Sequence, residues 1–348
     1  MTDDLRLSII IVNYNYGRFL GAAIESALAQ TWRDVEVIVV DDGSTDGSAE
    51  VMARYGDRIK ALRKENGGQA SAFNLGFEHS SGDLIILLDA DDLLYPTRAE
   101  RAIARYRPGI AKIQCRLNTI DRDGRDLSMT FPFYPPSLSS SEIRRRALRF
   151  GEYPWAPASG NVFSRDYLRH VMPIPPAFRY NADGYLNLCA PLYGEVETVP
   201  EALGAYRVHG ANNLAKENLG ADYKSHIGYD LLLRHSFLAK AAECGYKIDE
   251  RGFPFSKNHL EDRILSLRIA PERHQVSEDS RADLMRRGIR SAWIAPDINI
   301  LGRLLWCAWF VVIGVMPLSM VVYLVKRFRL QHFRSQIARA LVLLSRRN

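Results

Sequence analysis

Short apolar runs alternate with amphipathic segments over the first hundred residues of the chain. The runs at residues 7–12, 35–40 and 84–88 are rich in leucine and β-branched side chains, as is typical of strands buried on both faces of a sheet. Between the first two runs, residues 19–28 repeat apolar side chains at helical spacing. Strands that alternate with helices in this way form βαβ units. We therefore predict an α/β fold with a doubly wound, mostly parallel sheet flanked by helices.

Beyond about residue 108 the alternation becomes less regular. Residues 112–117 predict another strand, and residues 131–160 resemble a long loop with one basic helix. The remainder is mostly helical in pattern. We expect an α/β domain over residues 1–212, a helical extension over 213–300, and a hydrophobic hairpin with a basic amphipathic tail, suited to a membrane, over 301–348.

Two aspartate clusters directly follow two of the predicted strands. Asp41 and Asp42 follow the second strand, and Asp89, Asp91 and Asp92 follow residues 84–88. Open α/β sheets bind ligands at this edge, and several carboxylates there repel one another unless a cation or hydrogen-bond donors offset the charge. Mg²⁺ and Mn²⁺ prefer oxygen ligands and commonly bind substrate phosphates as well. A single cluster could serve only as helix caps and turns, but two clusters at one edge favour a metal-dependent nucleotide site.

The positive charge of the chain is concentrated at its C-terminal end. The formal net charge is +6, and residues 326–348 contain seven lysine and arginine residues but no acid, so residues 1–325 carry a net −1. Nucleic-acid binding would require basic residues distributed over a folded face with aromatic residues between them. Here the basic residues follow an apolar stretch, which excludes nucleic acid as the expected partner and favours anionic lipid.

The motifs, taken in order, resemble those of bacterial family 2 glycosyltransferases. They are residues 7–15 (LSIIIVNYN), 41–46 (DDGSTD), 66–68 (NGG), 82–92 (GDLIILLDADD) and 206–209 (YRVH). The resemblance covers about the first three-fifths of the chain. It implies the GT-A fold and inverting transfer from a nucleotide-activated sugar. UDP is the nucleotide that the resemblance favours, with dTDP and GDP as alternatives.

The resemblance also implies a set of nucleotide-binding residues. Tyr14 corresponds to the aromatic residue that stacks on the base, and Asp42 to the carboxylate that accepts a hydrogen bond from the base. Asp89 would contact the ribose. Gly67 and Gly68 would let the backbone approach the nucleotide closely. Tyr14 could instead serve only to cover the loop.

A divalent metal and its surroundings are implied in the same way. Asp91 would bind Mn²⁺ or Mg²⁺ that bridges the diphosphate, and His209 resembles a late histidine of the family near that site. Asp92 would support the ligand carboxylate by hydrogen bonding, and Asp41 would orient the first acidic loop. An isolated histidine is often structural, which remains the alternative for His209.

The catalytic base is expected at Asp183. The family often has Glu-Asp at this place, and here Ala182 replaces the first acid. Asp183 would take the proton of an acceptor hydroxyl, although it could also cap the helix that follows. Trp155, together with Tyr153, could form a platform for a sugar or acceptor in the loop at 131–160.

Residues 304–325 form a 22-residue stretch without a charge, interrupted by Gly314 and Pro317. A continuous helix of this length would reach about 33 Å, enough to cross a bilayer core of about 30 Å. A cytosolic donor places the start of the stretch inside the cell, and the basic tail also belongs inside. A helical hairpin bent at 314–317 satisfies both requirements. The alternative is a core helix packed on the rest of the protein.

The overall expectation is a sugar transferase at the cytoplasmic face of the inner membrane. The four cysteines are widely spaced and the N-terminus lacks a signal-like pattern, which favours an intracellular protein. The acceptor would be a glycan or lipid-linked hydroxyl in cell-surface polysaccharide synthesis. Two other classes stay open: a non-catalytic nucleotide-sugar-binding scaffold at the membrane, and a sugar nucleotidyltransferase, which would want a Gly-rich triphosphate loop near the N-terminus.

Overall fold

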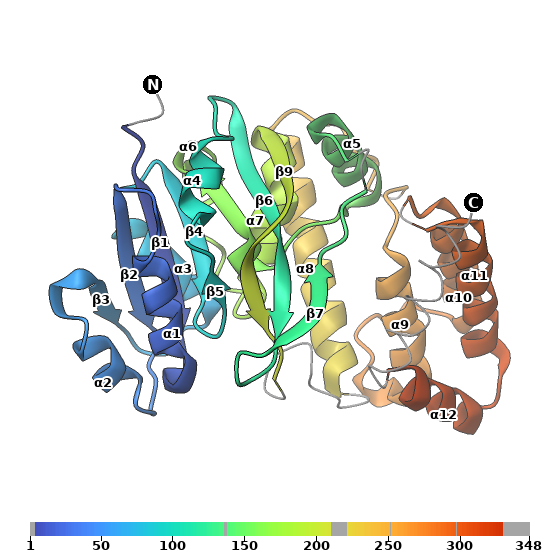
Figure 1. The fold of residues 1–348 in the computed structure, drawn as a ribbon. Helices are drawn as coiled ribbons and strands as arrows, with labels where there is room; N and C mark the ends of the chain where they lie inside the picture. Colours follow the sequence, from blue (N-terminus) through green and yellow to red (C-terminus); the bar gives the residue numbers. More distant parts are fainter. Residues whose placement is uncertain (1–3, 136–137, 210–220, 251, 297, 330–348) are drawn as a thin grey trace. The chain divides into compact units, whose positions relative to one another are not determined.

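The computed structural model describes residues 4–135, 138–209, 221–250, 252–296 and 298–329 (Figure 1). The chain divides into two compact units. The first unit combines Met1–Ala215 with Leu233–Arg251, and the second combines Lys216–Leu232 with Gly252–Asn348. Helix α8 (Ala221–Glu243) contributes residues to both units. Residues 252–300 and the hydrophobic segment that follows them therefore belong to one unit.

The first half of the sheet is parallel, as the apolar runs predict. Its strands are β1 (Leu7–Asn13), β2 (Val35–Asp41), β3 (Lys60–Arg63) and β4 (Leu84–Asp89), in the order β3-β2-β1-β4. Every neighbouring pair among them is parallel. The carboxyl ends of β1, β2 and β4 therefore lie side by side at one edge, because Asn13 pairs with Asp41 and Val12 with Asp89.

The second half of the sheet is mixed. It contains β8 (Asn161–Ser164), β6 (Ile110–Ile120), β9 (Glu195–Arg207) and β5 (Leu93–Leu94), with β7 (Asp126–Phe131) paired to β6. β9 runs parallel to β6, whereas β8 is antiparallel to both of its neighbours. The sequence does not predict β5 or β7, because β5 has two residues and β7 is almost wholly exposed.

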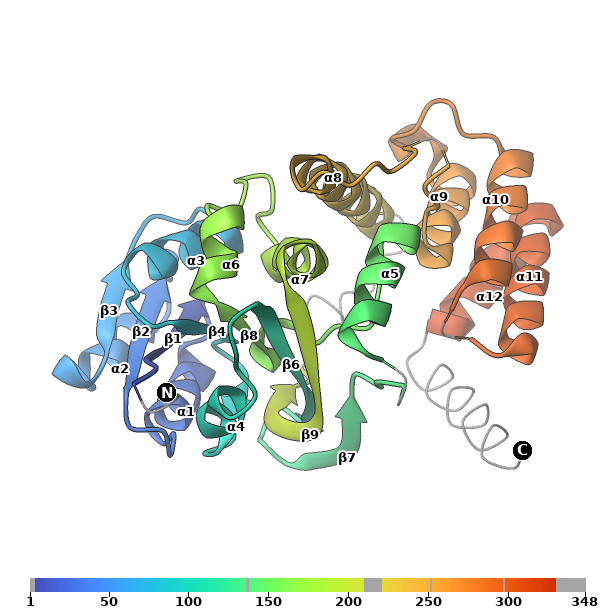
Figure 2. The ribbon, with the colours of Figure 1, turned by 90° about the horizontal axis from the view of Figure 1, so that it is seen from above.

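Helices cover both faces of this sheet (Figure 2). Helices α1 (Gly17–Leu28) and α4 (Arg98–Ile103) pack on one face, and α3 (Gln69–Glu78), α6 (Arg165–Val171) and α7 (Ala182–Tyr193) lie on the other. The unit also contains α2 (Ser48–Ala53), α5 (Ser140–Phe150) and the later part of α8. Successive strand residues point to opposite faces, so a run buried on both sides must be apolar throughout.

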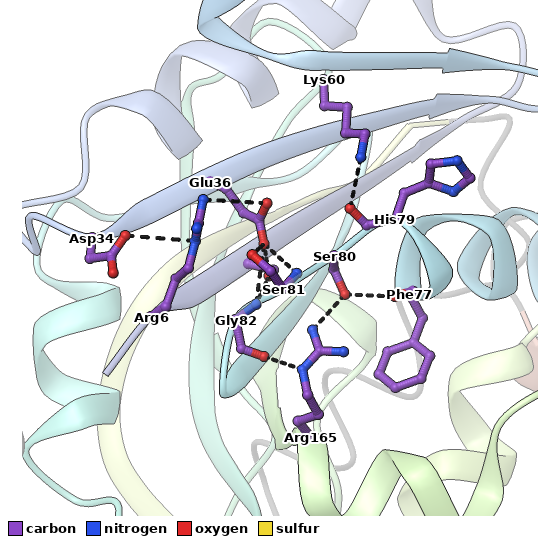
Figure 3. A network of polar contacts seen from close by, with 11 residues as sticks. Arg6, Asp34, Glu36, Lys60, Phe77, His79, Ser80, Ser81, Gly82 and Arg165 are labelled. Atoms are coloured by element: carbon purple, nitrogen blue, oxygen red, sulfur yellow. Dashed lines mark hydrogen bonds and ion pairs between the residues drawn. The ribbon is translucent and has the colours of Figure 1, made fainter. Parts of the chain in front are cut away.

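A polar network fixes the ends of the strands opposite the aspartate clusters (Figure 3). The Glu36 carboxylate accepts hydrogen bonds from Ser8 Oγ at 2.6 Å, from the Ser81 amide at 2.6 Å and from the Gly82 amide at 3.2 Å. Arg165 donates from Nη2 to Ser80 Oγ at 2.8 Å. Burial opposes ionisation of Glu36, but the hydrogen bonds from Ser8 and Ser81 lower its pKa below the ordinary value. The network thus joins β1, β2 and the turn before β4 through an ionised carboxylate.

The second unit is helical. It is built from α9 (Lys257–Ile269), α10 (Arg281–Ile294), α11 (Ile300–Val315) and α12 (Leu318–Arg329), with part of α8. The uncharged stretch at 304–325 is divided between two helices, because α11 ends at Val315 and α12 begins at Leu318, on either side of Met316–Pro317. Among the described residues, the structure contains no helix that is both long enough and apolar enough to cross a membrane. All four cysteines are free thiols.

Candidate active site

The first acidic cluster closes the end of β2. Asp41 is buried; its Oδ1 accepts a hydrogen bond from Asn13 Nδ2 at 2.9 Å, and its Oδ2 lies 3.3 Å from Arg63 Nε. It therefore ties the ends of β1, β2 and β3 together. Ser44 Oγ accepts a second hydrogen bond from Asn13 Nδ2 at 3.0 Å. These contacts make Asp41 part of the floor beneath the acidic loop.

Asp42 holds the glycine loop that precedes α3. Its Oδ1 accepts hydrogen bonds from Lys64 Nζ at 2.8 Å and the Gly67 amide at 2.9 Å, and its Oδ2 accepts one from the Gly68 amide at 2.7 Å. A carboxylate offers about four acceptor positions, so these donors leave about one for a ligand. Asp42 is 3% exposed. The main role of the Asp42 side chain is therefore to anchor the glycine loop, and at most one acceptor position is left for a nucleotide base.

Gly68 occupies a position that only glycine fits. Its φ of +85° is the left-handed region, and a Cβ there would lie 2.7 Å from the carbonyl oxygen of Arg179. The segment at Arg179 is bonded to the same loop, because the Gln69 amide donates to the Arg179 carbonyl at 2.8 Å and Arg179 Nη2 donates to Asn66 Oδ1 at 3.0 Å. These two hydrogen bonds therefore hold the glycine loop against the segment that precedes α7.

The second acidic cluster lies at the end of β4. Asp92 is fully buried and accepts hydrogen bonds from Ser159 Oγ at 2.6 Å and the Arg207 amide at 2.9 Å. Arg207 Nε also donates to the Asp91 carbonyl at 2.8 Å. The end of β9 is thus bound to the acidic loop, which brings residues more than one hundred positions apart into contact.

His209 lies beside Asp91. The His209 Nε2 and Asp91 Oδ2 atoms are 2.9 Å apart, and the imidazole stacks on Phe19 with ring centroids 5.1 Å apart. Tyr16 contacts the same imidazole edge-on at 5.6 Å. Burial, followed by the charges of Asp91 and Asp89, raises the pKa of Tyr16 to about 12. Two potential metal ligands are thus placed together inside an aromatic setting.

Burial and mutual repulsion disfavour full ionisation of the carboxyl groups in the acidic loop. Burial and the charges of Asp91 and Asp183 raise the pKa of Asp89 to about 8. Burial and the charges of Asp91 and Asp89 raise the pKa of Asp92 well above its ordinary value. A cation at this edge would offset the repulsion.

Asp183 lies in the first turn of α7 and is partly exposed. Asn187, one turn later, donates from Nδ2 to Asp183 Oδ2 at 3.3 Å. Burial raises the pKa of Asp183 to about 6, and the positive charge of Lys112 opposes this rise. Lys112 is fully buried on β6, where its Nζ donates to Asn187 Oδ1 at 2.7 Å. An acid with this pKa is mostly ionised at neutral pH and can accept a proton.

Gln69 links the acidic loop to the start of α7. Its Nε2 donates to Asp89 Oδ1 at 3.1 Å, and its Oε1 accepts from the Ala182 amide at 2.9 Å. A single side chain thereby holds Asp89 and the neighbour of Asp183 in one place. Ala182, which replaces an acid in the family pattern, contributes its backbone amide to this link.

The two aromatic residues expected at the site lie in different settings. Tyr14 directly follows β1 and is 48% exposed, so its ring is open to a ligand. Trp155 is half-buried and packs edge-on against Tyr153, with ring centroids 5.2 Å apart. Tyr153 itself is buried and its hydroxyl donates to the Asn187 carbonyl. The expectation that Tyr153 forms part of a platform is therefore wrong, because its ring is buried and its hydroxyl is bonded to a carbonyl of α7.

Several residues of this site are absent from the sequence-based prediction. They are Tyr16, Gln69, Lys112, Ser159, Asn187 and Arg207. Arg207 stands inside the YRVH motif, and Gln69 directly follows the NGG motif, so both had a nearby signal. Lys112 and Asn187 had none, because an isolated lysine in a strand and an asparagine in a helix carry no functional pattern.

Comparison with known proteins agrees with this geometry. Residues 8–171 match the model of glycosyl transferase family 2. An uncharacterized glycosyltransferase of Nostoc sp. is 37% identical over 216 residues, which are 60% of this chain and 66% of that protein. Glycosyltransferase GlyG of Streptococcus pneumoniae is 38% identical over 92 residues, which are 25% of this chain and 31% of GlyG.

The fold is also found among crystal structures. S. aureus TarS 1–349 in complex with UDP-GlcNAc superposes with a TM-score of 0.55 at 14% sequence identity, covering 95% of this chain and 88% of that chain. The curated relatives are matched over part of their length only, 66% for the Nostoc protein and 30% for one from Rickettsia typhi. The ordered motifs, the mixed sheet flanked by helices and the family match together show that residues 8–171 of this chain belong to glycosyl transferase family 2 and that the chain has the GT-A fold.

Proposed function

We propose that this chain is an inverting glycosyltransferase that moves a sugar from a nucleotide-sugar to a hydroxyl group. The observation that carries the proposal is that Asp183 lies close to the aspartates at the strand ends, because Gln69 bonds both Asp89 and the amide of Ala182. The pKa of Asp183 is about 6. A transferase needs one base and, next to it, a site that stabilises the charge of the leaving group. The group of carboxylates at this edge of the sheet could supply that site by binding a cation. A UDP-sugar is the first donor to test, since a TarS structure of the same fold contains UDP-GlcNAc.

The nucleotide would lie along the carboxyl ends of β1, β2 and β4. The exposed ring of Tyr14 would stack on the base, and the remaining acceptor position of Asp42 would receive a hydrogen bond from it. Asp89 would contact the ribose. The amides of Gly67 and Gly68 point at Asp42, so their role is to hold that carboxylate rather than to bind phosphate.

Asp91 and His209 would hold a divalent cation, Mn²⁺ or Mg²⁺. A carboxylate oxygen and an imidazole nitrogen 2.9 Å apart fit two ligands of one ion. Among the described residues, no three Asp, Glu, His or Cys side chains are placed so that together they could hold a metal ion, so the other positions would belong to diphosphate oxygens and water. When bound, the ion would neutralise charge that develops on the leaving diphosphate.

Asp183 would act as the general base. It takes the proton of the acceptor hydroxyl while that oxygen attacks the anomeric carbon, and the bond from this carbon to the diphosphate oxygen breaks. Attack from the side opposite the leaving group inverts the configuration. At pH 7 a group with a pKa of about 6 is about nine-tenths ionised, so the base is ready in its active form. The acceptor we propose is a glycan or lipid-linked hydroxyl in cell-surface polysaccharide synthesis.

A donor panel tests this function. UDP-, dTDP- and GDP-sugars are incubated with and without Mn²⁺ or Mg²⁺, and nucleotide release is followed for wild type, Asp91→Ala and Asp183→Asn. Asp166→Asn is the matched control, because the Asp166 side chain is 80% exposed and lies in α6. We expect metal-dependent release from one donor, lost in both site variants and kept in the control. Binding of a nucleotide without turnover, even with acceptor extracts added, would favour the non-catalytic scaffold.

A further inference from the structure

Helix α11 in the second unit is apolar on all sides beyond Arg303, in its first turn. One side packs inward: Phe310 and Ile313 are fully buried in the cluster formed with α9 and α10. The other side is exposed and carries an apolar stripe, which consists of Leu301, Leu304, Leu305, Ala308, Val311 and Val315. Spacings of three and four residues place these side chains on one helix face. A helix that is hydrophobic all round is normally covered on all sides.

Specific packing fixes the direction in which this stripe points. A Cβ on Gly288 would lie 2.2 Å from the Phe310 ring, so α10 and α11 approach as closely as a glycine permits. Trp309 Nε1 donates to Glu261 Oε1 of α9 at 2.8 Å. Because both contacts lie on the inward side, α11 cannot rotate to bury the stripe without breaking them.

The end of α11 is also held in place. Arg268 of α9 donates to the carbonyl oxygens of Ile313 and, at 2.6 Å, of Met316. These bonds satisfy carbonyl groups that the end of a helix leaves unpaired. Beyond the break, Leu318, Met320 and Tyr323 of α12 are 45%, 46% and 62% exposed. The exposed apolar surface therefore continues across the turn.

We infer that the apolar stripe of α11, with the exposed apolar residues of α12, docks this protein on the surface of an anionic lipid bilayer. Charge identifies the partner. Residues 304–325 carry no charge, and the segment that follows, from Lys326 to residue 348, holds seven basic residues and no acid. An apolar face flanked by cations matches an acyl boundary beneath anionic headgroups.

The helix lengths favour a helix lying in the membrane surface. α11 has 16 residues and so extends about 24 Å, less than the about 30 Å of a bilayer core. In this position the stripe inserts between lipids, and Lys326 follows at the level of the headgroups. The docking surface is independent of the catalytic assignment, since a protein without turnover would still bind vesicles.

Vesicle flotation of the full-length protein tests the inference. Vesicles contain phosphatidylcholine alone or mixed with phosphatidylglycerol, and wild type is compared with Leu304→Glu/Val311→Glu. The matched control is Leu127→Glu/Met129→Glu, which changes two residues of similar exposure in β7. About half of Leu304 and Val311 is exposed, so we expect at least a tenfold loss of vesicle affinity in the stripe variant. The control should float as wild type does.

The charge component has its own variant. Lys326→Gln/Arg327→Gln/Arg329→Gln should lower affinity for the anionic vesicles by about fivefold for each charge removed. Binding to phosphatidylcholine alone should change little. Circular dichroism melting of every variant shows that the helices remain folded.

Three results would overturn the inference. The first is that wild type fails to float with anionic vesicles. The second is that the stripe variant floats as well as the control. The third is that, without lipid, wild type is a dimer that the stripe variant converts to a monomer while vesicle binding is unchanged, which would assign the stripe to a second copy of this chain.

Discussion

Replacing Lys112 by methionine should raise the pKa of Asp183, the proposed base. Lysine donates hydrogen bonds in either protonation state, so Lys112 keeps Asn187 Oδ1 facing it and Asn187 Nδ2 facing the base. Burial raises the pKa of Asp183 to about 6, and the charge of Lys112 limits this rise. Lys112→Met removes the charge and the hydrogen bond to Asn187 Oδ1. It thereby loosens the Asn187 amide, whose Nδ2 is then held by the Ala156 carbonyl at 3.3 Å and no longer also through Lys112. Both changes disfavour the ionised carboxylate.

The size of the effect follows from the geometry. A hydrogen bond to a charged group contributes about 1.5–3 kcal/mol, and the Asn187–Asp183 distance of 3.3 Å favours the lower end. One pKa unit corresponds to about 1.4 kcal/mol, so the pKa of Asp183 should move from about 6 to about 7. The ionised fraction would fall about fivefold at pH 6 and about twofold at pH 7, and it would be nearly unchanged at pH 9.

The assay is the dependence of kcat/KM on pH, from about 5 to 9, with the donor found in the panel. Lys60→Met is the matched control, because Lys60 is an exposed lysine of β3. We expect the acidic limb to move upward by about one unit in Lys112→Met and to stay in place in Lys60→Met. A uniform loss of activity at every pH, with an unmoved acidic limb, would refute the reasoning and leave Lys112 with a packing role.

Three further predictions concern other parts of the first unit. Glu36→Ala should lower the free energy of unfolding by about 2–3 kcal/mol at pH 7. Because the pKa of Glu36 is lowered in the folded state, the difference in stability between wild type and variant should shrink in thermal melts as the pH falls below about 4.3. Gly68→Ala should weaken nucleotide binding measured by calorimetry. Gly245→Ala is the control, because Gly245 also has a positive φ but no atom lies within 4 Å of an added Cβ, so this variant should lose stability alone. Equal nucleotide affinity of the two variants would contradict the close approach at Arg179. Gln69→Leu should lower kcat at least about tenfold by releasing Asp89 and the start of α7, with donor affinity changed much less; unchanged kinetics would mean that Gln69 does not position the base.

The parallel half of the sheet and its aspartates are predictable from sequence because their signals are local. Each strand is an apolar run, and each acidic cluster follows its strand directly. The pairing of Asn13 with Asp41 and of Val12 with Asp89 then brings both clusters to one edge, as the topology of parallel strands requires. The resemblance adds roles to residues that the pattern has already placed together.

The support beneath the base is not predictable in this way. Lys112 and Asn187 are 75 residues apart, and they meet only because α7 packs on β6. A buried lysine in a strand contradicts the usual apolar pattern, so its position is informative only once the fold is known. Tyr153 illustrates the same limit, because an aromatic residue in a proline-rich loop gives no indication of which side it faces.

The anchoring of the glycine loop has a consequence for how a ligand arrives. Asp42 receives its hydrogen bonds from Lys64, Gly67 and Gly68, which are all donors of the protein itself. The conformational entropy of the glycine loop is therefore lost when the protein folds. The free energy of nucleotide binding then contains no cost for ordering this loop. A nucleotide would meet a rigid surface, so its binding should involve little backbone movement here, and its selectivity should come from shape fixed in advance.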